Sequence, residues 1–359
     1  MPHLLVDISS HGFGHVSQTA PVVNALTQLM PELRITLRTA APLAILRQRF
    51  RCEFAHIPAA FDFGMKMSSA VDVLVDASAA AYRDFHAGWE AKVQREAQAL
   101  RALSPDLLLA NIPYLSLAAA QLVGMRAVAM CSLDWADIYR HYCARDAASR
   151  EIFGQMVAAY NSAACFLQPQ PSMPMPGFSN TRSIAPIACI GRNQRATLAA
   201  QLPAAAEKLV LVAMGGMEFR LPMESWPRIR GVRWLVPAAW KIGRDDVSAF
   251  DSFGLAFGDV LASCDAVLTK PGYGTFAEAA CAGIPVLYVA RRDWPEEPWL
   301  VQWLQRHGAC LEVGRAMLET GELSAVLQQL WALPRPPLPI PAGANEAAHY
   351  LRDLIAVRA

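Results

Sequence analysis

A glycine-rich loop between a predicted strand and a predicted helix gives the strongest chemical signal in the sequence. The run DAVLTK predicts a buried strand that ends at Lys270, and Gly272, Tyr273, Gly274 and Thr275 follow in the loop. Glycines let backbone N–H groups approach a ligand closely. The first turn of a helix offers unpaired N–H groups and positive potential, and Thr275 is placed to cap this one. The combination predicts a site for a phosphate or diphosphate.

Charged side chains surround the predicted phosphate site. Glu278 lies one turn into the helix, where a carboxylate can accept hydrogen bonds from ribose hydroxyls. The next predicted strand is followed by Arg291, Arg292, Asp293 and Glu296. Ligands bind beyond the carboxyl ends of parallel strands. We therefore expect an arginine to neutralise phosphate, and Asp293 or Glu296 to accept from sugar hydroxyls.

A simpler interpretation of the same segment is also open. A strand, a glycine loop and a capped helix are ordinary features of α/β proteins. Thr275 could serve only as a cap, and Glu278 could be a solvated surface residue. The coincidence of all these parts within one strand–helix–strand unit favours the phosphate site.

A second loop places histidines at the end of the first predicted strand. The strand at 3–9 leads into His11, Gly14 and His15, and a helix is expected to start close to Val16. A histidine ionises near neutral pH and can remove a proton from an acceptor hydroxyl. The alternative is a packing or capping histidine. The pair could also bind a metal, but no nearby Cys, Asp or His completes a ligand set.

The predicted strands and helices that flank these loops indicate two α/β domains. In the first half we expect strands at 3–9, 33–39, 106–112 and 126–132. Helices are expected between them, among them 78–103 and 146–163. The second half repeats this alternation of strands and helices, with strands at 208–214, 231–237, 265–270, 284–290 and 309–313. Apolar strands that alternate with helices indicate parallel sheets covered on both faces.

A proline-rich segment marks the expected boundary between the domains. Residues 168–183 contain four prolines and predict an extended linker. We therefore expect an N-terminal domain at 1–185 and a C-terminal domain at 186–340. A last helix, at 341–359, is expected to pack back toward the N-terminal domain. The predicted fold class is α/β, with two Rossmann-like, doubly wound domains facing a central cleft.

Composition excludes several classes of protein. Lys and Arg number 32 against 31 Asp and Glu, so no bulk charge favours binding to nucleic acid. The eight cysteines are far apart and form no C-x-x-C pair, as expected of thiols in a reducing compartment. Neither a signal-type segment nor an apolar run of membrane-spanning length is present. We expect a cytoplasmic protein, and the mildly positive mean hydropathy leaves peripheral membrane contact open.

The two loops resemble the motifs of one known group. Segment 265–298 resembles the donor-binding motif of nucleotide-sugar glycosyltransferases of the GT-B fold, which include the lipid-II-forming N-acetylglucosaminyltransferase. The pattern at 272–275, followed by 291–293 and the glutamate pair at 296–297, is closest to the glycosyltransferase-like N-terminal portion of L-arabinokinases. The resemblance implies a GT-B fold and a glycosyltransferase activity.

The resemblance also implies roles for particular residues. A glycine–histidine pair in the first loop supplies a catalytic or acceptor-side histidine in these families, so Gly14-His15 makes His15 the first candidate and His11 the second. Related enzymes often have an acid near the position of Asn111. An asparagine can orient an imidazole but cannot balance its positive charge. Asp134, after the following strand, is the other candidate partner.

The remaining expectations concern the donor and the reaction. Gly215 and Gly216, after strand 208–214, are expected to bring backbone close to the donor phosphate, with a tight turn as the alternative. No D-x-D pair suited to Mg²⁺ is present, so no metal or other cofactor is expected, and the co-substrate is expected to be a UDP-sugar. The acceptor is expected to be a small molecule or a lipid-linked sugar, and transfer is expected to invert the anomeric centre. The alternatives are a silent nucleotide-sugar-binding protein, a nucleotide-sugar epimerase or hydrolase, and a structural partner of another enzyme.

Overall fold

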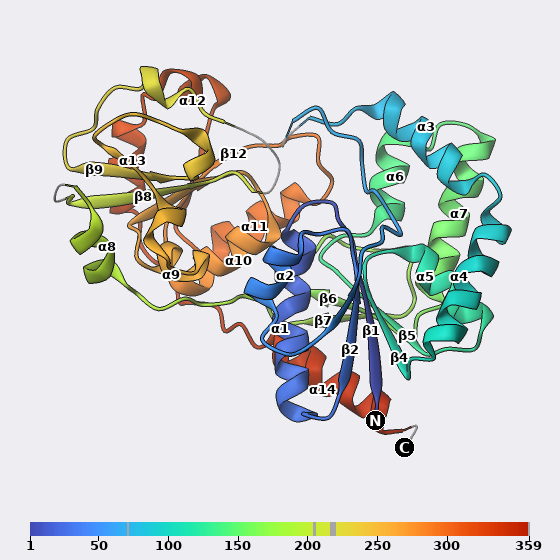
Figure 1. The fold of residues 1–359 in the computed structure, drawn as a ribbon. Helices are drawn as coiled ribbons and strands as arrows, with labels where there is room; N and C mark the ends of the chain where they lie inside the picture. The colour runs from blue at the N-terminus through green and yellow to red at the C-terminus, as the bar shows by residue number, and fades with distance from the viewer. Residues whose placement is uncertain (70–71, 204–205, 216–219, 358–359) are drawn as a thin grey trace.

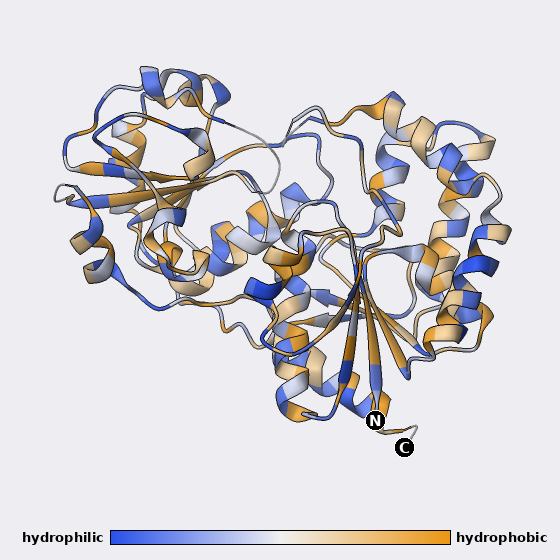
Figure 2. Cartoon of the chain, in the orientation of Figure 1, coloured by the Kyte–Doolittle hydropathy of each residue, from blue (hydrophilic) through white to orange (hydrophobic). Residues whose placement is uncertain are grey.

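Two parallel β-sheets with helices on their faces make up the molecule (Figure 1). The structure is a computed structural model that describes residues 1–69, 72–203, 206–215 and 220–357. The strands are short and largely buried, and most of their length is coloured as apolar in Figure 2. A strand covered by helices on both faces is apolar on both sides, which is why these segments read as continuous apolar runs.

In the described part of the chain, the first sheet has strand order β3-β2-β1-β4-β5-β6-β7, with every pairing parallel. Its strands are β1 His3–Ile8, β2 Arg34–Arg38, β3 Ala55–Ile57, β4 Leu107–Asn111, β5 Ala127–Met130, β6 Cys165–Pro169 and β7 Thr181–Ile184. Its helices are α1 Gly14–Leu29, α2 Leu43–Arg49, α3 Val75–His86, α4 Trp89–Leu103, α5 Tyr114–Leu122, α6 Trp135–Cys143 and α7 Ala147–Asn161. We call this part of the chain the N-terminal domain.

The single helix expected at 78–103 is wrong, because the structure has α3 and α4 in its place. Gly88 lies between them and has a φ of 66°. That left-handed conformation cannot continue a right-handed helix, so the chain turns at this glycine.

The linker expected at 168–183 is also wrong. Residues 165–169 and 181–184 form the parallel strands β6 and β7, which complete the first sheet. The prolines lie at the end of β6 and in the loop between the two strands, where a missing N–H group interrupts no ladder. The passage between the sheets begins only after Ile184.

The second sheet, within the described ranges, has strand order β10-β9-β8-β11-β12-β13 and is also parallel. Its strands are β8 Lys208–Ala213, β9 Val232–Val236, β10 Val247–Ala249, β11 Ala266–Thr269, β12 Val286–Val289 and β13 Cys310–Val313. Its helices are α8 Arg195–Gln201, α9 Phe257–Ala262, α10 Tyr273–Ala282, α11 Glu297–His307, α12 Arg315–Thr320 and α13 Ser324–Ala332. We call this part the C-terminal domain.

The last helix, α14 (Gly343–Ala356), lies against α1 of the N-terminal domain (Figure 1). It buries Ala347, Ala348 and Leu351 in the same apolar core as Val16 of α1. Its C-terminal end is held where the guanidinium of Arg126 donates to the carbonyl of Leu354 at 2.6 Å. Within the described ranges, no helix has both the length and the apolar character needed to cross a bilayer.

Candidate functional site

A cavity of about 520 Å³ opens between the carboxyl ends of the two sheets. The loops that follow β1, β5, β8, β11 and β12 line it, together with residues of α1, α2 and α10. In each sheet the strand order reverses next to these loops, between β1 and β4 in the first and between β8 and β11 in the second. Open parallel sheets bind their ligands at such switch points, and the volume is typical of a small-molecule site.

The N-terminus of α10 faces this cavity. The helix begins at Tyr273, with Gly272 as its N-cap and no side-chain hydrogen bond at the cap. Thr275 therefore lies inside the first turn, and the expectation that it caps the helix is wrong. With no side-chain cap, N–H groups of the first turn remain available to an anion.

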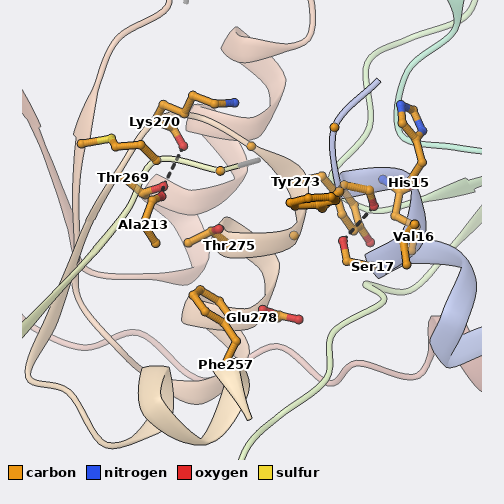
Figure 3. A pocket seen from close by; sticks show the side chains of 18 of the residues that line it. His15, Val16, Ser17, Ala213, Phe257, Thr269, Lys270, Tyr273, Thr275 and Glu278 are labelled. Carbon is orange, nitrogen blue, oxygen red and sulfur yellow. Dashed lines mark hydrogen bonds between the residues drawn. The ribbon is translucent and has the colours of Figure 1, made fainter. Parts of the chain in front are cut away.

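The N-terminus of α1 reaches the same cavity from the other domain. A Cβ atom on Gly274 would lie 2.8 Å from Oγ of Ser17, so the two helix starts are almost in contact. The hydroxyl of Ser17 donates to the carbonyl of Gly14 at 2.7 Å (Figure 3). Two positive helix ends thus point into one space.

Two cations, the half-buried Lys270 and the buried Arg291, add to this positive potential. Burial, together with the nearby charge of Arg291, lowers the pKa of Lys270 to about 8. Burial also lowers the pKa of Arg291 to about 10. Its guanidinium stacks 3.7 Å from the ring centre of Trp294, and its Nε has no hydrogen-bond partner among the described residues. A buried cation with an unpartnered donor, such as Arg291, favours a ligand of negative charge.

Glu278 lines the cavity on the next turn of α10. Its carboxylate is 3.7 Å from the guanidinium of Arg49, which comes from α2 of the N-terminal domain. Burial raises the pKa of Glu278 to about 7, against the opposing effect of Arg49. The residue is therefore not the solvated surface glutamate of the simpler interpretation.

His15 lies on the opposite side of the pocket from Lys270 (Figure 3). Its Nδ1 is 2.9 Å from Oδ1 of Asn111, at the end of β4. Burial lowers the pKa of His15 to about 4, although the hydrogen bond to Asn111 raises it. The imidazole is therefore neutral at pH 7, with Nε2 left to act on a ligand.

His11 lies beside two tryptophans. Its ring meets Trp135 edge-on at 5.1 Å and is parallel to Trp294 at 6.4 Å between ring centres. Burial and the nearby charges of His15 and Arg291 lower the pKa of His11 to about 3. It lines both the main cavity and an adjoining hollow formed by Ser10–Phe13 and residues from 60 to 67. His11 therefore lies where the two spaces adjoin, together with Gly12 and Phe13.

The other expected residues divide into two groups. Besides those described above, Gly215 and Glu296 line the cavity. Gly215 has a φ of 85°, and a Cβ atom there would be 3.3 Å from Cε of Lys270. Gly216 lies outside the described residues.

Four expected residues do not line the cavity in the described structure: Asn111, Asp134, Arg292 and Asp293. Asp134 is the N-cap of α6, where its carboxylate accepts from the N–H of Asp137 at 2.7 Å. Asn111, not Asp134, is the hydrogen-bond partner of His15. Arg292 projects into solvent and pairs with Glu312 at 3.0 Å. The side chain of Asp293 is 76% exposed and lies 3.2 Å from His141. The two charged residues follow the strand as expected but turn away from the ligand space.

Several residues of the cavity were not predicted from the sequence. Gln18, Arg49 and Ser132 come from the N-terminal domain, and Phe250 and Phe257 come from the C-terminal domain. Gln18 is one helical turn after Gly14 and Ser132 follows a predicted strand, so their positions relative to the first loop gave a usable signal. Arg49 and the phenylalanines carry no such signal, because only the packing of distant elements brings them to the cavity.

Solved structures with a similar arrangement of two sheets identify the fold of the chain. The chain matches the glycosyltransferase of kitacinnamycin with a TM-score of 0.62 and 16% identity, over 99% of this chain and 95% of that one. It matches CalG4, the calicheamicin glycosyltransferase, with a TM-score of 0.62 and 17% identity, over 99% and 94% of the two chains. A UDP-glucosyltransferase from Polygonum tinctorium gives a TM-score of 0.60 at 13% identity, over 99% and 93%.

The chain has the GT-B fold. The expected fold class and the expected resemblance to GT-B glycosyltransferases are confirmed. The L-arabinokinase of Arabidopsis thaliana is 24% identical over 340 residues, which are 91% of this GT-B chain. They are 32% of that protein, so the chain spans about a third of the length of its curated relative. No model of a protein family matches the chain.

Proposed function

We propose that this GT-B protein transfers a sugar from a nucleotide-sugar donor to an acceptor hydroxyl. One observation carries the proposal: a single cavity has a glycine-rich helix start and the cations Lys270 and Arg291 on one side, and a neutral buried histidine on the other. The first set suits the diphosphate of a donor, and the second suits removal of a proton from an acceptor.

The donor would lie along α10. N–H groups of the turn 272–275 and the charges of Lys270 and Arg291 would bind the diphosphate, while Glu278 would accept from the ribose hydroxyls. We expect a UDP-sugar as the donor. The helix ends and cations supply positive charge where the leaving diphosphate develops negative charge, so we propose that transfer needs no metal ion.

The acceptor would lie on the His15 side of the cavity, with its hydroxyl within reach of the imidazole. In a single displacement, Nε2 of His15 takes the proton of the acceptor hydroxyl, whose oxygen forms a bond to the anomeric carbon. The bond from that carbon to the diphosphate oxygen breaks, and the nucleoside diphosphate leaves with the electron pair. Attack from the face opposite the leaving group inverts the anomeric centre.

Calorimetric titration tests the donor site. UDP, GDP and dTDP and their sugar conjugates would be titrated in the presence of EDTA into the wild type, Glu278→Ala and Asp293→Ala. We expect one nucleotide to bind selectively, and Glu278→Ala to weaken it about tenfold or more, because a charge-assisted hydrogen bond is lost. Asp293→Ala is the matched control from outside the cavity and should change affinity less than about twofold. A folded protein that binds none of the nucleotides would contradict the proposal.

A second candidate function is supported by one observation, the amide partner of His15. Asn111 cannot balance the charge of an imidazolium ion as a carboxylate would, which favours a protein that binds nucleotide sugar without turning it over. Release of free nucleotide from the selected donor, measured with and without an acceptor panel, separates the two. Release that depends on acceptor supports transfer, release without acceptor indicates a hydrolase, and binding with no release supports a sensor.

A further inference from the structure

A continuous series of side-chain hydrogen bonds joins His15 to Glu296 and crosses from one domain to the other. Nδ1 of His15 is 2.9 Å from Oδ1 of Asn111. The amide of Asn111 donates to Oε1 of Gln18 at 3.2 Å, and the amide of Gln18 donates to the hydroxyl of Ser132 at 2.8 Å. That hydroxyl donates to Oε1 of Glu296 at 2.7 Å. We call these five residues the relay.

All five side chains of the relay are buried. Asn111 is 0% exposed, Ser132 is 1% exposed and Gln18 is 2% exposed. Bulk water therefore does not compete for these hydrogen bonds, and each donor must find an acceptor within the protein. The amide of Asn111 also reaches the backbone carbonyl of His15 at 3.5 Å, a longer contact than the one to Gln18. Four of the residues belong to the N-terminal domain, and only Glu296 comes from the C-terminal domain.

The direction of the relay is fixed at its Glu296 end. An ionised carboxylate can only accept, so the hydroxyl of Ser132 must donate to it. The oxygen of Ser132 then accepts from the N–H of Gln18, which leaves the amide oxygen of Gln18 for Asn111. The reverse direction would bring two acceptors, the oxygens of Ser132 and Glu296, within 2.7 Å of each other.

At the other end of the relay, this direction determines which ring nitrogen of His15 carries the hydrogen. With its amide N–H directed to Gln18, Asn111 presents its oxygen to His15, and Nδ1 of the neutral imidazole must then carry the hydrogen. Nε2 is left with the lone pair. An asparagine alone could turn its amide to favour either form, since it has both a donor and an acceptor.

We propose that Glu296 of the C-terminal domain sets the tautomer of His15 through Ser132, Gln18 and Asn111. Glu296 is thus a positioning residue for the base and not a reader of the sugar. The base role rests on the function proposed above, whereas the control of the tautomer does not. The consequence is that His15 holds its lone pair on Nε2 only while the two domains are docked.

The surroundings of Glu296 suit the end of such a relay. Its second oxygen, Oε2, accepts from Nε1 of Trp294 at 3.2 Å. Burial raises the pKa of Glu296, while the hydrogen bonds from Ser132 and Trp294 and the charges of Arg291 and Lys270 lower it. Both carboxylate oxygens are therefore engaged by protein donors, which is the arrangement of an anchored group.

Nuclear magnetic resonance of the full chain with ¹⁵N-labelled histidine tests the proposal. His15→Gln identifies the signals of His15, and the long-range couplings then report which ring nitrogen carries the hydrogen. We expect the wild type and Ser132→Thr, which keeps the hydroxyl, to hold the hydrogen on Nδ1. Ser132→Ala and Gln18→Leu, which break the relay at different points, should shift His15 to the other tautomer or to a mixture.

An unchanged Nδ1–H form in folded Ser132→Ala and Gln18→Leu would overturn the proposal. With an active donor–acceptor pair, the same two variants should lower kcat about tenfold or more at unchanged donor KM, and Ser132→Thr should restore it. If the tautomer shifts as expected but the protein has no transferase activity, the relay is supported and only the proposed function is contradicted. The two failures are therefore distinguishable.

Discussion

At the scale of single residues, the charge of Lys270 controls how strongly the cavity attracts an anion. Burial lowers its pKa to about 8, so the charged form dominates only below that pH. We predict that the affinity for the nucleoside diphosphate selected by calorimetry falls as pH rises above about 8, by up to tenfold per pH unit. The carboxyl group of Glu278, with a pKa raised to about 7, titrates below this range.

Titration of that ligand between pH 8 and 9.5 measures the decline. The variant Lys270→Gln keeps a polar side chain, one atom shorter, without the charge, so its affinity should be lower at pH 8 and nearly constant up to pH 9.5. An equally steep decline in Lys270→Gln would show that another group is responsible.

The second residue-scale prediction concerns His15. We expect His15→Ala to lower kcat by roughly 10²- to 10⁴-fold, the usual contribution of a general base, with the affinity for nucleotide unchanged. Because burial lowers the pKa of His15 to about 4, the neutral base persists on acidification. At saturating donor, activity should fall only as pH drops through about 4, and not near the ordinary histidine value of about 6.5. An acid limb near 6.5 that persists at saturating donor would contradict this assignment.

At the scale of the elements, α14 is held to the N-terminal domain by its apolar face. Leu351 is 0% exposed within the core that α14 shares with α1. We predict that Leu351→Ala lowers the free energy of unfolding by about 2–5 kcal/mol, because it removes buried methyl groups and leaves a cavity. Urea titration measures this loss. The neighbouring Arg352→Ala, which alters an exposed pair with Asp353, should change the stability by no more than about 0.5 kcal/mol.

Sequence periodicity predicted most central strands of both sheets but failed where a local conformation decided the outcome. The apolar runs at β1, β4, β8 and β11 were clear because such strands are buried on both faces. The break between α3 and α4 depends on the left-handed φ of Gly88, which composition does not reveal. Strands β6 and β7 were hidden by the prolines near them, although prolines at a strand end are compatible with a sheet.

At the scale of the whole molecule, Tyr273 ties α10 to the N-terminal domain and to the passage between the domains. Its hydroxyl accepts from the N–H of Ile187 at 2.8 Å and donates to the carbonyl of Gln170 at 3.1 Å. We predict that Tyr273→Phe lowers the free energy of unfolding by about 1–3 kcal/mol, because two backbone groups lose their partner.

Hydrogen exchange localises the effect of that substitution. The amide of Ile187 should exchange faster in Tyr273→Phe, whereas the amides in the centre of β8 serve as an internal reference and should keep their rates. Equal acceleration in both places would mean that the variant loosens the whole protein and that Tyr273 has no special role in the passage.

The candidate site was predictable to the extent that it follows strand ends. Lys270, Gly272 and His15 lie at or just after the carboxyl ends of parallel strands. Their positions relative to the predicted strands therefore indicated that they line the site. Arg49 and Glu296 each act across the gap between the domains. Their partners depend on how two separately wound sheets face each other, which no spacing along the chain encodes.

The chain passes between the domains twice, after β7 and before α14, and hydrogen bonds join these two segments. Beside β7, the N–H of Ala185 donates to the carboxylate of Glu346 at 2.9 Å. At the start of α14, the N–H of Gly343 donates to the carbonyl of Pro186 at 3.1 Å. A Cβ atom on Gly343 would lie 1.9 Å from the carbonyl oxygen of Ala185, so only glycine allows the passages to touch. The same close approach makes Gly343 a shared point of both passages: a larger side chain there would push the start of α14 away from residues 185–187 and strain both connections between the domains at once.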